Sequence, residues 1–155
     1  MLMLAGIGDK DECGRLVDEA VESGEALKRF EMMVKLQGGD VSYIEDTSKF
    51  RKASFSREVY APADRYITHM DSEKIGLTAV LLGAGREKKD DDINHAAGII
   101  IAAKTGDFVK RGELLATLFA DDESRLDGAE SRYLFAVSIG DKKPAEQPMI
   151  LDYID

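Results

Sequence analysis

The chain has 155 residues, in which 30 Asp and Glu outnumber 21 Lys and Arg and leave a formal net charge of −9. Hydrophobic residues make up 44% and charged residues 33%, a balance that is typical of a globular domain and excludes a disordered chain. The acidic excess argues against a nucleic-acid partner, because phosphate backbones are bound by basic surfaces. The sequence therefore predicts one folded domain, or one domain with an appendage.

Few residues could hold a metal ion or form a disulfide. Cys13 is the single cysteine, which excludes an internal disulfide and a cysteine-rich zinc site. His69 and His95 stand far apart, with no second ligand at helical spacing. The apolar opening stretch, 1–7, lacks the basic start of a signal peptide and is far shorter than the ~20 residues that span a bilayer. We therefore expect no metal, no membrane partner and a cytoplasmic location.

Two amphipathic helices are predicted over residues 9–37. Asp9 can accept backbone N–H groups at an N-cap, and Glu12 stands three residues later, as in a capping box. Gly24 is the expected end of the first helix, and Gly38-Gly39 the end of the second. Two helices with one apolar face each cannot bury both faces alone. This segment is therefore expected to need a further surface.

The pattern changes to short strands after a polar stretch, 40–51, which predicts a linker. Asp71 is the expected N-cap of a short helix, and a second helix is predicted over 124–138. The run 98–103 is rich in isoleucine and predicts a strand buried on both faces. Because strands and helices segregate after residue 50, the predicted fold class is α+β. The expected strands are 54–61, 66–70, 98–103, 114–119 and 148–154.

Two turns, 104–107 and 110–113, separate the strands 98–103 and 114–119. A strand, a Gly-Asp turn, a Gly-Glu turn and another strand are typical of a hammerhead of the biotinyl or lipoyl type, in which glycine adopts positive φ. Carriers of that type also display a lysine at a hairpin tip. The matching upstream stretch offers Lys74, which falls in a predicted helix. The pattern therefore favours a scaffold over a carrier.

A glycine-rich stretch, Gly83-Ala84-Gly85-Arg86, follows the short helix. Its backbone N–H groups, together with Arg86, Lys88 and Lys89, could form an anion-binding loop. A glycine pair after a helix is more often only a helix end, and Asp90-Asp91-Asp92 would oppose an incoming anion. The structural interpretation is favoured, and the functional one is kept as an alternative.

Four carboxylates gather before the last helix, and they lack the spacing of a calcium loop. Their simplest role is to cap that helix and to favour its positive dipole end. The sequence contains no Gly-x-Ser-x-Gly motif, no paired Cys and His, and no phosphate-binding loop. We therefore predict no catalytic residue in this chain. The four carboxylates are Asp121, Asp122, Glu123 and Asp127.

Two sets of spaced motifs occur in order along the chain. The first set is Glu22-Ser23-Gly24, Phe30 and Gln37-Gly38-Gly39-Asp40. The second set is Leu81-Leu82-Gly83-Ala84-Gly85-Arg86, Lys89-Asp90, Ile93, Ala97-Gly98-Ile99 and Lys104-x-Gly106-Asp107-x-Val109-x-x-Gly112-Glu113-x-Leu115-Ala116-Thr117. Taken in order, the second set resembles the C-terminal domain of bacterial pyrimidine-nucleoside phosphorylases, and the first set resembles the helical segment that precedes that domain.

The resemblance implies a homodimeric pentosyltransferase that reversibly cleaves uridine, thymidine or deoxyuridine to free base and pentose 1-phosphate. Phosphate is its co-substrate, and the resemblance implies no cofactor in this chain. The family's catalytic, base-binding and cation-binding residues belong to the part that precedes the matched region, so none is carried over. Thymidine phosphorylase is the alternative parent. The chain is expected to be a C-terminal piece of a longer protein and to be inactive alone.

The resemblance also implies a division of the chain and a candidate loop. Residues 1–46 would end the family's central catalytic domain, and residues 47–155 would form an α/β-hammerhead domain that makes one wall of the cleft. The region 86–95 would approach the mouth of that cleft. Two alternatives remain open: a biotinyl- or lipoyl-type carrier, and an interaction module that uses the apolar face of residues 1–37. The candidate cleft residues are Gly83, Gly85, Arg86, Lys88 and Lys89.

Overall fold

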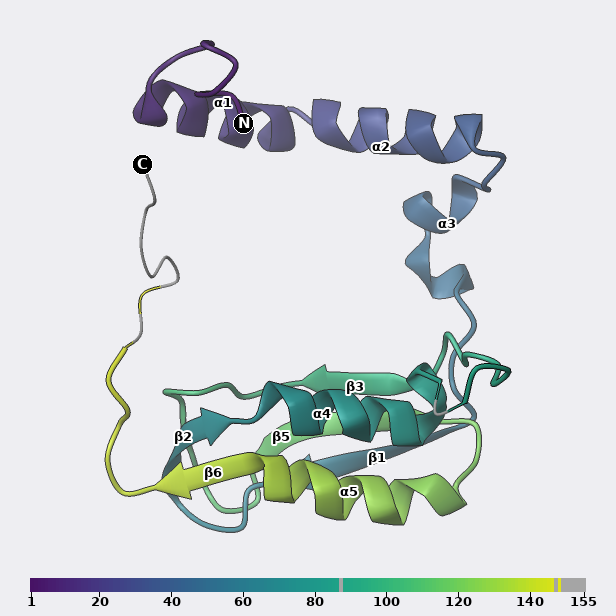
Figure 1. Cartoon of the computed structure of the whole chain (residues 1–155), viewed down its shortest axis with the longest axis vertical. Helices are drawn as coiled ribbons and strands as arrows, with labels where there is room; N and C mark the ends of the chain where they lie inside the picture. The colour runs from purple at the N-terminus through teal and green to yellow at the C-terminus, as the bar shows by residue number, and fades with distance from the viewer. Residues whose placement is uncertain (87, 147, 149–155) are drawn as a thin grey trace. The chain divides into compact units, whose positions relative to one another are not determined.

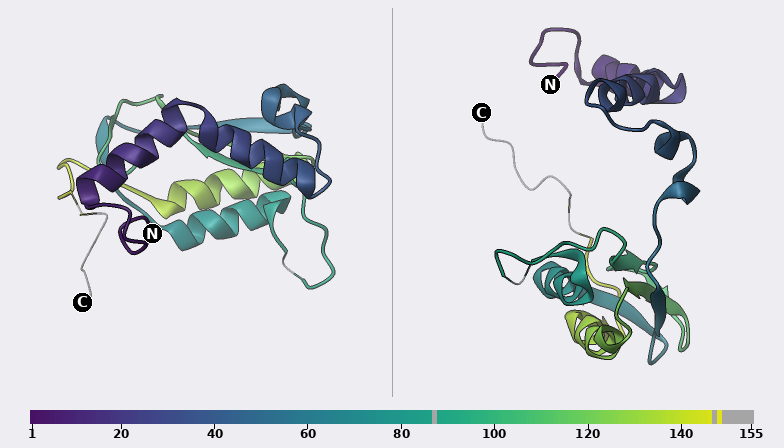
Figure 2. Two further views of the ribbon diagram at one scale, coloured as in Figure 1. Left: turned by 90° about the horizontal axis from the view of Figure 1, so that it is seen from above. Right: turned by 90° about the vertical axis from the view of Figure 1, so that its right-hand side faces the viewer.

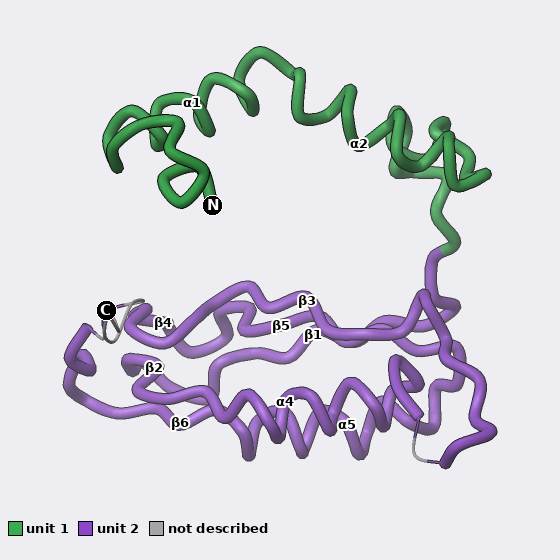
Figure 3. The backbone as a smooth tube through the Cα atoms, turned by 45° about the horizontal axis from the view of Figure 1, so that its top comes forward, with its two compact units in different colours: residues 1–51 green, residues 52–155 purple. Residues whose placement is uncertain are grey.

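The structure, a computed structural model, describes residues 1–86, 88–146 and 148 (Figure 1). The chain forms two compact units, Met1–Arg51 and Lys52–Asp155, coloured separately in Figure 3. From the sequence, the division was expected between residues 46 and 47. The assignment of residues 1–46 to the end of a catalytic domain stays a prediction.

Unit 1 is helical, and its first two helices follow the predicted start at Asp9 and the predicted glycine stops. The Asp9 carboxylate accepts a hydrogen bond from the backbone N–H of Glu12 at 2.9 Å, which confirms the predicted N-cap. Gly24, with φ of 76°, separates the first two helices, and Gly38, with φ of 80°, follows the second. The helices are α1 (Lys10–Glu22), α2 (Glu25–Leu36) and α3 (Ser42–Glu45), followed by a 3₁₀ turn over Thr47–Lys49.

The apolar faces of α1 and α2 are left open within unit 1. Cys13 is the one buried side chain among the residues described between 1 and 51. Val21 is 65% exposed on α1, and Phe30 is 47% exposed on α2. The two helices therefore do not bury each other's apolar faces, as the sequence predicted.

The stretch 40–51 is not the irregular linker that the sequence predicted. It contains α3 and the 3₁₀ turn, each preceded by an aspartate. The Asp40 carboxylate accepts from the backbone N–H of Ser42 at 2.9 Å, and the Asp46 carboxylate accepts from that of Ser48 at 3.0 Å. The hydrogen bond from the Ser42 backbone lowers the pKa of Asp40, and those from the Ser48 hydroxyl, at 2.6 Å, and the Ser48 backbone lower the pKa of Asp46. The polar residues of this stretch thus form local helix starts, where a loop was expected.

The described residues of unit 2 form two three-stranded antiparallel sheets and two helices, which confirms the predicted α+β class. One sheet has the order β1-β5-β3, and the other has the order β4-β2-β6. The finer hammerhead arrangement stays a prediction. The strands are β1 (Phe55–Tyr60), β2 (Arg65–Met70), β3 (Gly98–Ile101), β4 (Phe108–Val109), β5 (Leu114–Ala120) and β6 (Val137–Gly140). The helices are α4 (Ser72–Ala79), which continues into a π-helical turn over Val80–Ala84, and α5 (Ser124–Ala136).

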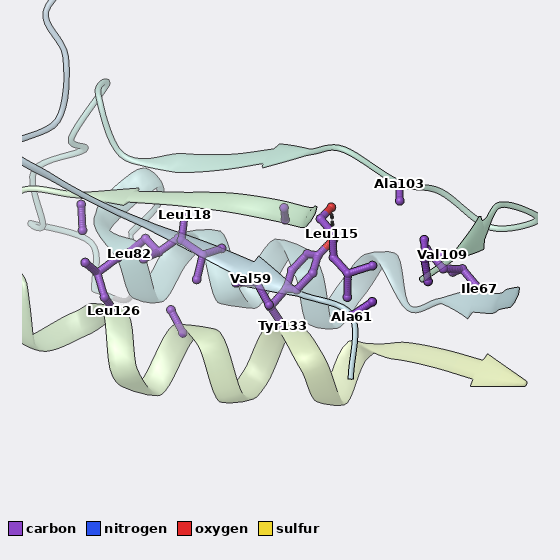
Figure 4. Close-up of a cluster of buried hydrophobic side chains, with 13 residues drawn as sticks. Val59, Ala61, Ile67, Leu82, Ala103, Val109, Leu115, Leu118, Leu126 and Tyr133 are labelled. Atoms are coloured by element: carbon purple, nitrogen blue, oxygen red, sulfur yellow. Dashed lines mark hydrogen bonds between the residues drawn. The ribbon is translucent and has the colours of Figure 1, made fainter. Parts of the chain in front are cut away.

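Most of the core of unit 2 lies between the helices and the sheet β1-β5-β3, and Ile67 of β2 and Val109 of β4 extend it to the second sheet. Figure 2 shows α4 and α5 side by side against one face of that sheet. Tyr133 of α5 is fully buried, and its hydroxyl donates a hydrogen bond to the Leu115 carbonyl at 3.5 Å (Figure 4). Burial raises the pKa of the Tyr133 phenol. The larger members of this core are Val59, Ile67, Leu82, Val109, Leu115, Leu118, Leu126 and Tyr133.

Two predicted elements differ from the structure, and a third lies largely outside the described residues. In the run 98–103, residues 98–101 form the edge strand β3, whose Ile100 is 63% exposed, so the expectation of burial on both faces was wrong. The helix predicted over 124–138 ends at Ala136, because residues 137–140 pair with β2 as β6. Of the strand predicted over 148–154, only Pro148 lies within the described residues.

The two turns 104–107 and 110–113 repeat the same hydrogen-bonding pattern. In each, the lysine N–H donates to the acidic side chain three residues later, at 2.7 Å in the first turn and 2.9 Å in the second. Gly106 and Gly112 have φ of 97° and 83°, as predicted for these turns. Each glycine N–H also donates to a backbone carbonyl of another segment at 2.8 Å. These bonds fasten both turns to the remainder of unit 2.

Candidate functional site

The candidate loop, 84–93, leaves the π-helical turn after α4 and leads back towards β3. Its two ends meet where Gly83 and Asn94 are hydrogen-bonded, and we call this contact the neck of the loop. Gly83 has φ of 107°, which ends the helix, and its carbonyl accepts from the backbone N–H of Asn94 at 2.9 Å. The Asn94 side-chain amide donates to the Asp121 carboxylate at 2.7 Å. Asn94 was not identified from the sequence, because its partner lies 27 residues away along the chain.

The basic residues of the loop are exposed. Arg86, Lys88 and Lys89 all present exposed side chains, while Glu87 lies outside the described residues. The Lys88 backbone N–H donates to the Asp91 carboxylate at 2.8 Å, and the Asp91 N–H donates back to the Lys88 carbonyl at 3.2 Å. One member of the aspartate run therefore holds the turn together at the tip of the loop.

A shallow cavity of about 290 Å³ lies beside the loop. Two cationic side chains and two carboxylates line it, which leaves no excess of positive charge for an anion. The Arg125 guanidinium also donates to the Leu81 carbonyl at 3.2 Å and lies 3.7 Å from the Asp122 carboxylate. This arrangement favours the structural interpretation of the glycine-rich stretch. The lining residues are Val80, Gly83, Gly85, Lys88, Asp91, Asp92 and Arg125.

Three of the four carboxylates at the start of α5 have separate roles. The Asp122 side chain accepts from the Ser124 hydroxyl at 2.6 Å and from its backbone N–H at 3.0 Å, and these bonds lower the pKa of Asp122. Asp127 lies in the first turn of α5 and pairs with Arg57 of β1. Asp121, which was predicted to cap α5, accepts hydrogen bonds from Ser54 and Asn94, in segments distant from that helix along the chain.

The described residues contain no group of three or more His, Cys, Asp or Glu side chains that could hold a metal ion. His69 lines a separate cavity of about 530 Å³, together with the turn 105–107 and residues 143–146. None of the helices within the described residues has the length and apolar composition needed to cross a membrane.

Lys74, the lysine considered for a carrier function, lies in α4 as predicted. Its ammonium group lies 2.8 Å from the Asp71 carboxylate and 5.0 Å from the centre of the Phe135 ring. The Asp71 carboxylate also accepts from the Lys74 backbone N–H at 3.1 Å, and the hydrogen bonds to Lys74 lower the pKa of Asp71. Lys74 is therefore part of a helix start and is not displayed at a hairpin tip.

Replacing Gly83 by alanine is expected to lower the free energy of unfolding of unit 2 by about 1–3 kcal/mol, because a side chain strains a backbone at this positive φ. The added Cβ would lie 3.6 Å from the Asn94 Cβ, an ordinary contact, so the cost comes from the backbone. Gly76→Ala is the control: it lies in α4 with nothing within 4 Å of the new Cβ, and should raise the free energy of unfolding by roughly 0.5–1 kcal/mol. Urea denaturation measures both changes in the free energy of unfolding. If both substitutions changed it in the same direction, the strain at Gly83 would be contradicted.

Comparison with known proteins gives this arrangement a context. Residues 66–140 match the family model described as the pyrimidine nucleoside phosphorylase C-terminal domain. The match begins in β2, ends at the last residue of β6, and includes the candidate loop and its neck.

Several curated bacterial proteins named pyrimidine-nucleoside phosphorylase are similar to this chain. That of Bacillus subtilis is 39% identical over 125 residues, which are 80% of this chain and 29% of that protein. That of Geobacillus stearothermophilus is 34% identical over 123 residues, 79% of this chain and 28% of that protein. That of Staphylococcus aureus strain USA300 is 34% identical over 142 residues, 91% of this chain and 33% of that protein. The chain thus spans about a third of the length of these relatives.

Proposed function

Because this chain belongs to the pyrimidine-nucleoside phosphorylase family, as a C-terminal portion of it, we propose that it serves in the phosphorolysis of pyrimidine nucleosides. The observation that carries the proposal is the match of residues 66–140, which covers most of the described part of unit 2. The proposed substrates are uridine, thymidine and deoxyuridine, with phosphate as co-substrate. Thymidine phosphorylase is the alternative parent.

The proposed reaction transfers a pentose between a base and phosphate. A phosphate oxygen bonds to the anomeric carbon as the bond from that carbon to the pyrimidine nitrogen breaks. The bonding electrons leave with the base, which then takes up a proton, and the sugar becomes (deoxy)ribose 1-phosphate. Such a reaction needs a held phosphate and positive groups that stabilise the departing base.

We assign this chain the role of a cleft wall without catalytic residues. In the described part of unit 2, Lys88 and Arg125 line one cavity, where the carboxylates of Asp91 and Asp92 offset their charge. Arg125 is held by Leu81 and Asp122, and Lys88 shares its cavity with Asp91 and Asp92. Arg86, Lys88 and Lys89 are exposed on the loop, which suits a position at the mouth of a cleft. Gly83 and Gly85 shape that loop.

The partners and the location follow as parts of the same proposal. The whole enzyme would be a cytoplasmic homodimer that binds a pyrimidine nucleoside and phosphate. No nucleic-acid or membrane partner is proposed for it.

The purified chain is expected to release no uracil from uridine at any phosphate concentration, because the residues that would hold phosphate and base are not among those it contributes. Liquid chromatography of the reaction mixture measures the free base. The Bacillus subtilis relative, assayed in parallel, shows that the assay detects turnover. Release of uracil by the chain, in proportion to its concentration, would contradict the proposed role.

A further inference from the structure

Asp121 directly follows the last residue of β5. Its two carboxylate oxygens accept hydrogen bonds from segments that are far apart in the sequence. Oδ1 accepts from the backbone N–H of Ser54 at 2.8 Å and from the Ser54 hydroxyl at 2.9 Å. Oδ2 accepts from the side-chain amide of Asn94 at 2.7 Å. One carboxylate therefore links residues that lie 67 and 27 positions away from it along the chain.

Ser54 belongs to the short segment 52–54 with which unit 2 begins, directly before β1. Phe55, the next residue, pairs with Ala120, which directly precedes Asp121. The Ser54 bonds to Asp121 therefore fasten the start of unit 2 to the end of the central strand β5.

Asn94 is the second partner of the Asp121 carboxylate, and it also forms the neck of the candidate loop. Its backbone N–H donates to the Gly83 carbonyl at 2.9 Å, and its side-chain oxygen accepts from the Ala96 N–H at 3.0 Å. Its carbonyl accepts from the Ala97 N–H at 3.1 Å. The Asn94 side chain is partly buried, where polar groups are usually hydrogen-bonded.

We propose that Asp121 is a positioning residue that couples the loop 84–93 to the segment 52–54. A charged carboxylate accepts these hydrogen bonds more strongly than a neutral group would, and the two sets of donors share it. Because both sets of donors bind one carboxylate, a change in the Ser54 bonds changes how the carboxylate is held and, with it, the bond to Asn94. The inference goes beyond the proposed function and stands on these hydrogen bonds alone, so it holds or fails whether or not the chain serves a phosphorylase.

The neighbouring Asp122 gives a matched control. It carries the same side chain one residue later, and its hydrogen bonds go to Ser124 at the start of α5. Asp121→Asn and Asp122→Asn thus make the same chemical change at adjacent positions. An asparagine at 121 has one side-chain oxygen that accepts hydrogen bonds, and its NH2 group takes the place of the other carboxylate oxygen. The donors that faced that oxygen, either those of Ser54 or that of Asn94, therefore lose their acceptor.

Amide hydrogen exchange of the full chain, resolved by NMR, tests the coupling. In Asp121→Asn, we expect the backbone N–H of Asn94 to exchange about tenfold faster, because its hydrogen bond to the Gly83 carbonyl opens more often. The Tyr133 amide in α5 should keep its rate. In Asp122→Asn, the Asn94 amide should keep its wild-type rate. An unchanged Asn94 rate in Asp121→Asn, or an equal acceleration of Asn94 and Tyr133, would overturn the proposal.

A second variant tests whether the two sides are linked through the carboxylate. Ser54→Ala removes one hydroxyl donor at a distance from the loop, and should accelerate exchange of the Asn94 amide by about threefold or more. In the Asp121→Asn background, the same Ser54 substitution should have a smaller effect on Asn94. Equal effects of Ser54→Ala in both backgrounds, or none in either, would show that Asp121 does not couple these segments.

Discussion

Leu118→Ala should lower the free energy of unfolding of unit 2 by about 2–5 kcal/mol, because truncating a buried leucine loses its transfer energy and leaves a cavity. Leu118 is fully buried in the central strand β5 and pairs with Arg57 on one side and Ile99 on the other. It lies at the junction of β1, β5 and β3, so the surrounding strands cannot move inward without breaking their ladders.

Urea denaturation followed by circular dichroism measures the loss, with Leu77→Ala as the control. Leu77 lies in α4 and is 54% exposed, so the same truncation there should change the free energy of unfolding by less than about 1 kcal/mol. A loss at Leu118 no larger than that at Leu77 would contradict the assignment of the core to the face between β5 and the helices.

Features that depend on neighbouring residues could be predicted from the sequence. Asp9 and Asp71 cap helices by accepting from the N–H group three residues later. Gly24 and Gly38 occupy positive φ after a helix, which side chains other than glycine rarely adopt. These interactions are complete within a few residues, so the local pattern contains all the information that they need.

Features that depend on pairing across the fold could not be predicted in this way. Residues 137 and 138 were predicted to continue the helix, but they belong to β6, which pairs with β2. Ile100 belongs to an apolar run, but it is exposed because β3 is an edge strand with one covered face. Both outcomes are decided by the position of a strand in its sheet, which the residues of that strand do not specify alone.

In the candidate loop, too, the local features could be predicted from the sequence and the long-range contacts could not. Gly83 and the charged run after it identified a loop in the sequence, and the structure has the loop there. The neck that holds the loop could not be predicted, because Asn94 and Ser54 meet Asp121 only after β1, β3 and β5 have paired. The aspartate itself was identified, but as a helix cap, because a helix begins a few residues after it in the sequence.

Transplanting this chain into a relative is expected to give a working phosphorylase. In the Bacillus subtilis protein, the stretch that aligns with this chain, 29% of its length, would be replaced by the aligned residues. The chains are 39% identical there, so the core and the turns of unit 2 should fold in the new context. A second chimera exchanges only the part that matches residues 66–140, which leaves the relative's own preceding helices in place.

The most direct measurement is the rate of uracil release from uridine and phosphate by these chimeras, compared with the Bacillus subtilis protein and with a version in which the aligned stretch is deleted. We predict that the chimeras release uracil and that the deleted version does not, because this chain completes the cleft and the relative contributes the catalytic residues. Folded chimeras that release no more uracil than the deleted version would contradict the proposal that this chain forms a wall of a pyrimidine-nucleoside phosphorylase.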